Sequence, residues 1–411
     1  MPLLFILYVV NFLDRVNLTY AVLDMRRDLG FSDSVYGFGA GIFFLGYLLL
    51  EIPGAIIVER WSARKWIARI MISWGLVTVL TAFVNTPHQF FAARFTLGLA
   101  ESGFFTGILV YIRHWFVAQD RAKAVGIFMA AIPLSNFFGS PLAGLLLRLH
   151  WFGLPGWRWL FLLEGIPAIL LGVVVLFLLT DYPRQARWLP ADECAYITSE
   201  LQSDAVPHTH LPDSWRILVQ PSVILLIASC FLHFTALFGL IYWLPTLLKR
   251  ASGLPNLTVT FLVSIPYFFS LISQVTSGWH SDRTGERRWH AALPVLIAGV
   301  ALAILPMRTL TLTQTIFLYS VASAGIYAYL GPFWAHTSHQ LRGTVAAGAT
   351  GSINAIASVG GFAGPYVVGS LNTHTGSSTA GVIYLTACAV LCGILLLIRI
   401  HTPQKASPQH A

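Results

Sequence analysis

The stretch "GWHSDRTGERRW", residues 278–289, decides how the rest of the sequence is interpreted, because a related stretch occurs earlier in the chain. The earlier copy is "AIIVERWSARKW", residues 55–66, and it lies 223 residues upstream. In each copy an acidic residue is followed directly by an arginine, and two adjacent basic residues come shortly afterwards. Each copy also lies between two long apolar runs. This duplication predicts a chain built from two similar halves.

The composition places both halves in a membrane. Of the 411 residues, 56% are hydrophobic and only 10% are charged, and the mean hydropathy is +0.70. These values exclude an ordinary water-soluble domain, and the apolar runs lack the two-residue alternation of a transmembrane β-barrel. We expect an all-α integral membrane protein with twelve spans, at about 3–22, 35–57, 66–85, 90–114, 122–147, 157–179, 220–247, 258–279, 290–308, 313–338, 345–370 and 379–399.

The net charge of +8 follows from membrane topology. With these spans, sixteen basic residues fall in the even-numbered loops and the C-terminal tail, and seven fall in the odd-numbered loops. Basic residues concentrate on the cytoplasmic side, so both termini are expected in the cytoplasm. The basic residues are thus explained without nucleic acid, and the lipid bilayer is the expected environment.

The longest polar stretch divides the spans six and six. It runs from about residue 180 to 219 and contains four prolines. We therefore expect an N-terminal half at 1–179, a cytoplasmic linker at 180–219 and a C-terminal half at 220–411. Two pseudo-symmetric six-helix halves are the architecture of a secondary transporter whose substrate site lies between them near the middle of the membrane.

Four charged residues interrupt the apolar runs. Asp14 and Arg15 lie in the first span, and Arg94 and Glu101 lie in the fourth. Charges at such depth usually face a cavity or a partner. Buried arginines suit an anionic substrate, and buried acids suit proton coupling. The alternative is that these four charges only hold the two helices together.

The duplicated loops resemble the signature loop of the major facilitator superfamily. The second copy fits at Gly278, Asp282, Arg283, Gly285, Arg287 and Arg288, whereas the first departs at Ala55, Glu59 and Ser62. A narrower resemblance is to the anion:cation symporter family, and within it to bacterial tartrate, phthalate and sugar-acid permeases. It is carried by "NFLDRVN", "RFTLGLAESGFF", "GWRWLFLLEGIPA", "IPYFFSLISQVTSGWHSDRTGERRWH" and "NAIASVGGFAGPYVVG".

The resemblance implies roles for individual residues. In sugar-acid symporters the acids matching Asp14 and Glu101 carry protons, and the arginines matching Arg15 and Arg94 engage the anion or its coupling network. Tyr47 and Asn354 match substrate-contacting positions, although each is equally compatible with helix packing. We also expect Trp334 in the substrate cavity as an aromatic gate, against the alternative of packing. Phe12 and Ile132 replace polar residues of sugar-acid relatives, which favours a smaller or aromatic carboxylate.

The duplicated loops are expected to act mechanically rather than to touch substrate. At the cytoplasmic surface their charges could latch the two halves together and release them during transport. The alternative is that they only set membrane topology. The expected latch residues are Glu59, Arg60, Arg64, Asp282, Arg283 and Arg287.

The resulting hypothesis is a monomeric, proton-coupled importer of a small organic anion in a bacterial inner membrane. No nucleotide-binding loop, metal-ligand cluster or nucleophile–base spacing is recognisable, so we expect no cofactor, no metal and no enzymatic activity. Three alternatives remain: a sodium symporter, an antiporter of another substrate class such as a drug exporter, and a nutrient sensor that no longer transports.

Overall fold

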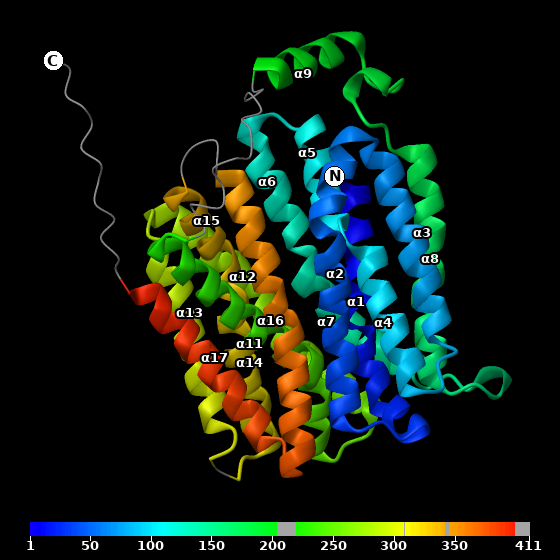
Figure 1. The fold of residues 1–411 in the computed structure, drawn as a ribbon, viewed down its shortest axis with the longest axis vertical. Coiled ribbons are helices and arrows are strands. Elements are labelled where there is room, and N and C mark those ends of the chain that lie inside the picture. The colour runs from blue at the N-terminus through cyan, green and yellow to red at the C-terminus, as the bar shows by residue number, and fades with distance from the viewer. Residues whose placement is uncertain (204–218, 308, 342–345, 399–411) are drawn as a thin grey trace.

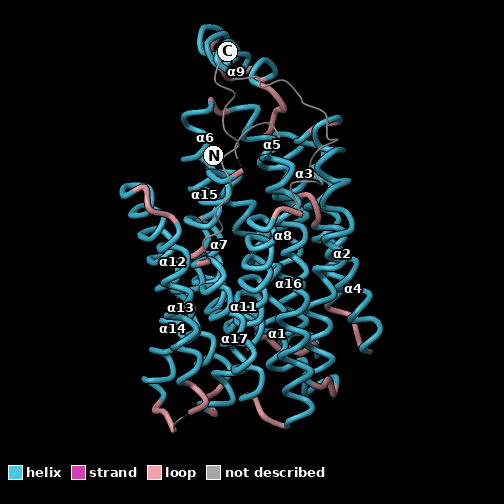
Figure 2. The backbone as a smooth tube through the Cα atoms, turned by 60° about the vertical axis from the view of Figure 1, so that its left-hand side comes forward, coloured by secondary structure: helices cyan, strands magenta, loops and turns pink. Residues whose placement is uncertain are grey.

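The computed structural model describes residues 1–203, 219–307, 309–341 and 346–398, and all regular structure within these ranges is helical (Figures 1 and 2). This confirms the predicted all-α fold. The helices are α1 (Pro2–Leu29), α2 (Asp33–Arg60), α3 (Ala63–Thr81), α4 (Pro87–Glu101), α5 (Phe104–Trp115), α6 (Ala118–Met129), α7 (Ala131–Leu146), α8 (Gly156–Leu178), α9 (Ala191–Ser203), α11 (Pro221–Ser252), α12 (Asn256–Thr284), α13 (Arg288–Ile304), α14 (Leu312–Ala328), α15 (Leu330–Gln340), α16 (Ala346–Thr375) and α17 (Thr379–Leu397).

Each of the twelve expected spans corresponds to one helix or to two consecutive helices. In the described ranges, nine segments are long and apolar enough to cross a membrane, and α13 is a shorter apolar helix. The helices α3 and α16 complete the set. Spans four, five and ten are each divided, into α4 and α5, α6 and α7, and α14 and α15.

The division of span four corrects the expectation of one continuous helix at 90–114. Gly103 has a φ of 79°, a left-handed conformation that glycine adopts without steric cost. Glu101 is consequently the last residue of α4. The other two divisions precede prolines: Pro133 and Pro332 are the third residues of α7 and α15. A proline lacks the backbone N–H that would continue the preceding helix.

The helices before and after the linker form two groups that meet along a few helix pairs. In the first group α3 packs against α8, and α2 against α4; in the second, α12 packs against α14, and α13 against α17. Between the groups, α2 packs against α16, α7 against α12, and α1 against α11. Figure 1 shows the first group in blue and cyan beside the yellow and orange helices of the second.

The contact between α2 and α16 depends on glycine. A Cβ atom on Gly37 would lie 2.4 Å from the carbonyl oxygen of Pro365, and one on Gly41 would lie 2.8 Å from that of Phe362. Cβ atoms in proteins essentially never lie this close to another heavy atom. Any side chain at either position would therefore push the two helices apart.

The expected linker contains a helix, α9, which lies outside the bundle at the top of Figure 1. The turn between α1 and α2 lies at the opposite end of the bundle. Residues 204–218 of the linker lie outside the described ranges. The expected linker boundaries at residues 180 and 219 stay a prediction.

Candidate functional site

The neighbours Asp14 and Arg15 turn toward different helices. Trp74 of α3 donates a hydrogen bond from Nε1 to Oδ2 of Asp14 over 2.5 Å. Oδ1 of Asp14 is buried and has no hydrogen-bond partner among the described residues. Arg15 instead reaches Glu101 of α4. The two charges therefore belong to separate contacts within one buried region.

One carboxylate oxygen of Glu101 accepts three hydrogen bonds. Its Oε1 accepts from Nδ2 of Asn11 over 2.6 Å and from Nε of Arg15 over 2.9 Å. Nη2 of Arg15 also donates to it. Only 2% of Glu101 is exposed, so this is an ion pair inside the bundle, and removing either partner would leave an uncompensated charge.

Arg94 is more fully buried than Arg15, and it forms no ion pair with any carboxylate that the structure describes. Its side chain is fully buried. Nε donates to the carbonyl oxygen of Gly39 over 3.4 Å, and Nη2 donates to Oη of Tyr242 over 3.3 Å. Nη1 has no partner in the described structure. Arg94 is thus a buried cation that hydrogen-bonds only neutral groups among the described residues.

Both guanidinium groups lie against the same aromatic ring. The guanidinium carbon of Arg94 is 5.1 Å from the ring centre of Phe43, and that of Arg15 is 5.3 Å from it. Arg15 also lies 5.2 Å from Phe12 and 5.3 Å from Tyr47. Aromatic faces stabilise buried cations without neutralising them. Tyr47 therefore belongs to this region, as expected, through its ring.

Tyr242 of α11 belongs to this region but was not predicted from the sequence. Its Oη donates to the backbone oxygen of Arg15 over 3.2 Å and accepts the hydrogen bond from Arg94. Its own carbonyl oxygen accepts from Tyr36 over 2.5 Å and from Thr19 over 2.9 Å. Tyr242 therefore joins helices of the first group to the second group. It lies in a purely apolar stretch, "FGLIYWLP", which contains no signal for this role.

Asn354 forms no described hydrogen bond with Arg15 or Arg94, but it contacts a second residue that was not predicted, Glu51. Its Nδ2 donates to Oε1 of Glu51 in α2 over 2.9 Å. Glu51 is 8% exposed, and its Oε2 has no partner among the described residues. An acidic residue within the apolar run "YLLLEIPGAII" was a usable signal, because it is the same signal that identified Asp14.

The structure does not bring Trp334 to the arginines. Its ring packs against Phe333 of α15, with ring centres 5.2 Å apart. Phe333 in turn stacks on Tyr329 at 4.6 Å. None of the contacts described for Trp334 reaches Arg15 or Arg94. Its expected role as a gate stays a prediction.

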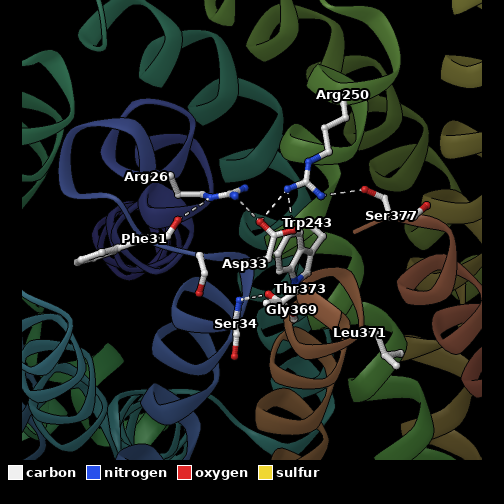
Figure 3. A network of polar contacts seen from close by, with 12 residues as sticks. Arg26, Phe31, Asp33, Ser34, Trp243, Arg250, Gly369, Leu371, Thr373 and Ser377 are labelled. Atoms are coloured by element: carbon white, nitrogen blue, oxygen red, sulfur yellow. Dashed lines mark hydrogen bonds and ion pairs between the residues drawn. The ribbon is translucent and has the colours of Figure 1, made fainter. Parts of the chain in front are cut away.

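A second charged cluster, drawn in Figure 3, lies where α1 turns into α2, and Figure 1 shows this turn at the opposite end of the bundle from α9. Arg250 of α11 donates from Nη2 to both carboxylate oxygens of Asp33, over 2.7 and 2.6 Å. Arg26 of α1 pairs with the same carboxylate at 2.5 Å. We call Arg26, Asp33 and Arg250 the Asp33 clasp. It borders a cavity of about 410 Å³ and links the two groups of helices.

The first expected latch loop makes its described contacts within its own group. The backbone N–H of Arg64 donates to Asp181 over 2.9 Å, and its Nη1 donates to the carbonyl oxygen of Leu176 over 3.3 Å. These contacts join the start of α3 to the end of α8. The side chains of Glu59 and Arg60 lie outside what the structure describes.

The second latch loop likewise stays within the second group. Arg287 donates to the carbonyl oxygen of Ala335 over 2.9 Å and lies 4.0 Å from Asp282. The guanidinium carbon of Arg283 lies 5.5 Å from the Trp279 ring centre. Among the described side chains, no hydrogen bond or ion pair joins Arg64 to Asp282, Arg283 or Arg287, so the latch stays a prediction for another conformation.

Comparisons with known proteins identify the family. The model of the Major Facilitator Superfamily matches residues 4–365. A protein of Agrobacterium vitis named "Putative tartrate transporter" is 42% identical over 405 residues, which cover 98% of this chain and 93% of the relative. This match confirms the resemblance to tartrate permeases.

Two further comparisons bear on function and fold. The "Quinolone resistance transporter" of Acinetobacter baumannii is 34% identical over 398 residues, covering 96% of this chain and 91% of that protein. The inward-facing, unoccupied structure of a bacterial homologue of the human lysosomal transporter Spinster aligns with a TM-score of 0.76. It is 18% identical, and the alignment covers 96% of this chain and 93% of the other. At that identity the structural match supports the fold alone.

Proposed function

This chain belongs to the major facilitator superfamily of transporters, and from that premise we propose that it imports a small organic carboxylate together with protons. The proposed substrates are tartrate-like, phthalate-like or sugar-acid anions. The name of the Agrobacterium vitis relative supports tartrate as the first compound to test. Phe12 and Ile132, which replace polar residues of sugar-acid relatives, favour the smaller or aromatic acids among these.

The observation that supports this proposal most directly is the burial of Arg94 without an ion-pair partner among the described residues. It is fully buried, one of its terminal nitrogens has no partner, and no described carboxylate pairs with it. Asp14 interacts with Arg94 electrostatically but does not form an ion pair with it. A buried cation without an ion-pair partner is stabilised by a ligand that supplies a negative charge. A guanidinium binds a carboxylate through two parallel hydrogen bonds. An organic anion is therefore the ligand class that this site suits best.

Competition for Arg15 supplies a coupling mechanism. In the described conformation the guanidinium of Arg15 is hydrogen-bonded to, and ion-paired with, Glu101. A proton on Glu101 removes the opposing charge and releases Arg15 for a substrate carboxylate. Each ligand then favours binding of the other, because coupling between two binding events is reciprocal. Asp14, which has one unpartnered oxygen, is the second proposed proton-binding group.

Alternating access would involve both charged ends of the bundle. We infer that residues 1–179 and 220–411 rock against each other as two bodies, with 180–219 as their connection. If both termini face the cytoplasm, the Asp33 clasp closes the outer side, and its opening would admit substrate. Glu59, Arg60 and Arg64, with Asp282, Arg283 and Arg287, would then latch the cytoplasmic side in the opposite state. The proposed location is a bacterial inner membrane, as a monomer.

The test is uptake by purified protein in liposomes, with pH, sodium and voltage gradients imposed separately. Labelled tartrate, phthalate, nicotinate, glucarate and galactonate are the probes. We expect one of these acids to accumulate under an inward proton gradient. Accumulation driven by sodium alone would show that the coupling ion is sodium rather than the proton. Absence of transport by folded protein under every gradient would favour a sensor.

The relative named for quinolone resistance supports a second candidate function, export by antiport with protons. The two functions differ in direction. In cells that express the protein, import predicts that labelled acid accumulates above the level of control cells. Export predicts that a quinolone accumulates less than in control cells while the acids are unaffected.

A further inference from the structure

We propose that Glu51 is a further proton-binding residue of the transport site, and that its protonation controls the contact between α2 and α16. This inference rests on the proposed proton-coupled function and deepens it. Asp14 and Glu101 lie on α1 and α4 of the first group. Glu51 differs from them because it bonds directly to the second group.

Glu51 lies beside the arginine site. It follows Tyr47 by one helical turn in α2, and the Tyr47 ring lies 5.3 Å from the guanidinium carbon of Arg15. Only 8% of Glu51 is exposed. A change of charge on this carboxyl would therefore act directly on the region that holds Arg15 and Glu101.

The surroundings of Glu51 provide little compensation for a negative charge. Its Oε1 accepts one hydrogen bond from the neutral amide of Asn354, and its Oε2 is buried without a partner. No described basic side chain forms an ion pair with it. The nearby charged groups, Arg15 of α1 and Glu101 of α4, are already paired with each other.

The neutral form of Glu51 suits this position better than the charged form. Burying a carboxylate with a single neutral partner is strongly unfavourable. A proton on Oε2 removes the charge and provides an O–H donor at the oxygen that now lacks a partner. Asn354 offers both an amide donor and a carbonyl acceptor, so acid and amide can pair through two hydrogen bonds.

The Glu51–Asn354 contact joins surfaces that alternating access must rearrange. It lies between α2 and α16, which are packed closely through Gly37 and Gly41. Separating the helices at this level would bring water to the carboxyl and stabilise its charged form. Proton release from Glu51 and separation of α2 from α16 would then favour each other.

The first experiment compares wild type with Glu51→Gln in liposomes, with labelled tartrate as the probe. Glutamine keeps the shape and the acceptor for Asn354 but cannot carry a proton. Tartrate counterflow, which needs no net proton movement, is recorded in both proteins to show that the variant still exchanges substrate. The number of protons moved per tartrate, measured from the reversal potential, should fall. If wild type moves protons with tartrate, an unchanged proton number in Glu51→Gln would overturn the proposal.

The second experiment separates failure of this inference from failure of the proposed function. Spin labels are placed at Leu49 of α2 and Ile356 of α16, two residues from each partner and both exposed. The distance distribution between them is recorded at acidic and alkaline pH without substrate. We expect it to change with pH in wild type and to be independent of pH in Glu51→Gln.

The combined results distinguish the two proposals. If wild type moves no tartrate with protons but the distance distribution loses its pH dependence in Glu51→Gln, the substrate or coupling assignment is wrong and the Glu51 proposal stands. If the variant keeps the wild-type pH dependence, the Glu51 proposal is wrong whatever the substrate. Glu193→Gln, which alters an exposed acid of α9 outside the bundle, is the matched control and should behave as wild type in both experiments.

Discussion

Replacing Glu101 with glutamine should raise the affinity for the anion at alkaline pH and abolish proton-driven accumulation. In wild type, Arg15 donates from two nitrogens to Oε1 of Glu101. A substrate carboxylate must compete with that ionised acceptor. Glutamine leaves an oxygen for Asn11 and Arg15 but removes the charge, so Arg15 becomes available at every pH.

The size of the effect follows from those two hydrogen bonds. A hydrogen bond that involves a charged group contributes about 1.5–3 kcal/mol. We take the upper part of that range for Arg15 with ionised Glu101, and the lower part for Arg15, which stays charged, with a neutral glutamine. Weakening both bonds from Arg15 therefore releases about 2 kcal/mol, which corresponds to roughly 30-fold tighter anion binding. The difference should narrow as pH falls, because protonation of the wild-type Glu101 removes the same charge.

The assay is calorimetric titration of the purified protein with tartrate across a series of pH values, paired with uptake in liposomes. We expect wild-type affinity to rise as pH falls and Glu101→Gln affinity to stay nearly constant. Exchange of tartrate should persist in the variant. Weaker binding by the variant at alkaline pH, or full accumulation under a proton gradient, would refute the role of Glu101. Glu193→Gln in α9 controls for loss of an acid elsewhere.

Three further predictions test other parts of the account. Arg94→Lys keeps the charge but loses the planar fork, so tartrate should bind about 30-fold more weakly in calorimetry; unchanged affinity would remove Arg94 from the pocket. Asp33→Asn should weaken the clasp by about 1–2 kcal/mol, since its arginines are partly exposed, and should increase alkylation of cysteines introduced beside it; unchanged labelling would contradict this. Gly98→Ala places a Cβ 2.0 Å from the Phe43 carbonyl oxygen and should lower the Tm, whereas Gly126→Ala, with nothing within 4 Å, should not; equal Tm values would refute the packing argument.

Much of the fold could be predicted because a membrane-spanning helix can be recognised from its own stretch of sequence. Apolar runs of sufficient length identified the spans, and charges inside those runs identified Asp14, Arg15, Arg94 and Glu101. Arg15 and Glu101 indeed lie in contact. The break after Glu101 was missed because it depends on the conformation of one glycine, Gly103, within an otherwise helical pattern.

The contacts between the two groups could not be read from the sequence. Asp33 and Arg250 are 217 residues apart, and Glu51 and Asn354 are 303 apart. Local periodicity places each residue on its helix but does not pair helices so distant in the chain. The role of Tyr242 is even harder to predict, because a tyrosine in an apolar run usually packs against other helices. Only its hydrogen-bond partners in the structure show that it lies between Arg15 and Arg94.

The most direct test of proton-coupled anion transport is the internal pH of liposomes that receive only a substrate gradient. Tartrate is added outside sealed vesicles at equal pH and zero voltage, and internal pH and labelled tartrate are recorded together. We expect the interior to acidify as tartrate enters wild-type vesicles, and we expect no such acidification with Glu101→Gln. Tartrate entry by wild-type protein without any change in internal pH would contradict proton symport.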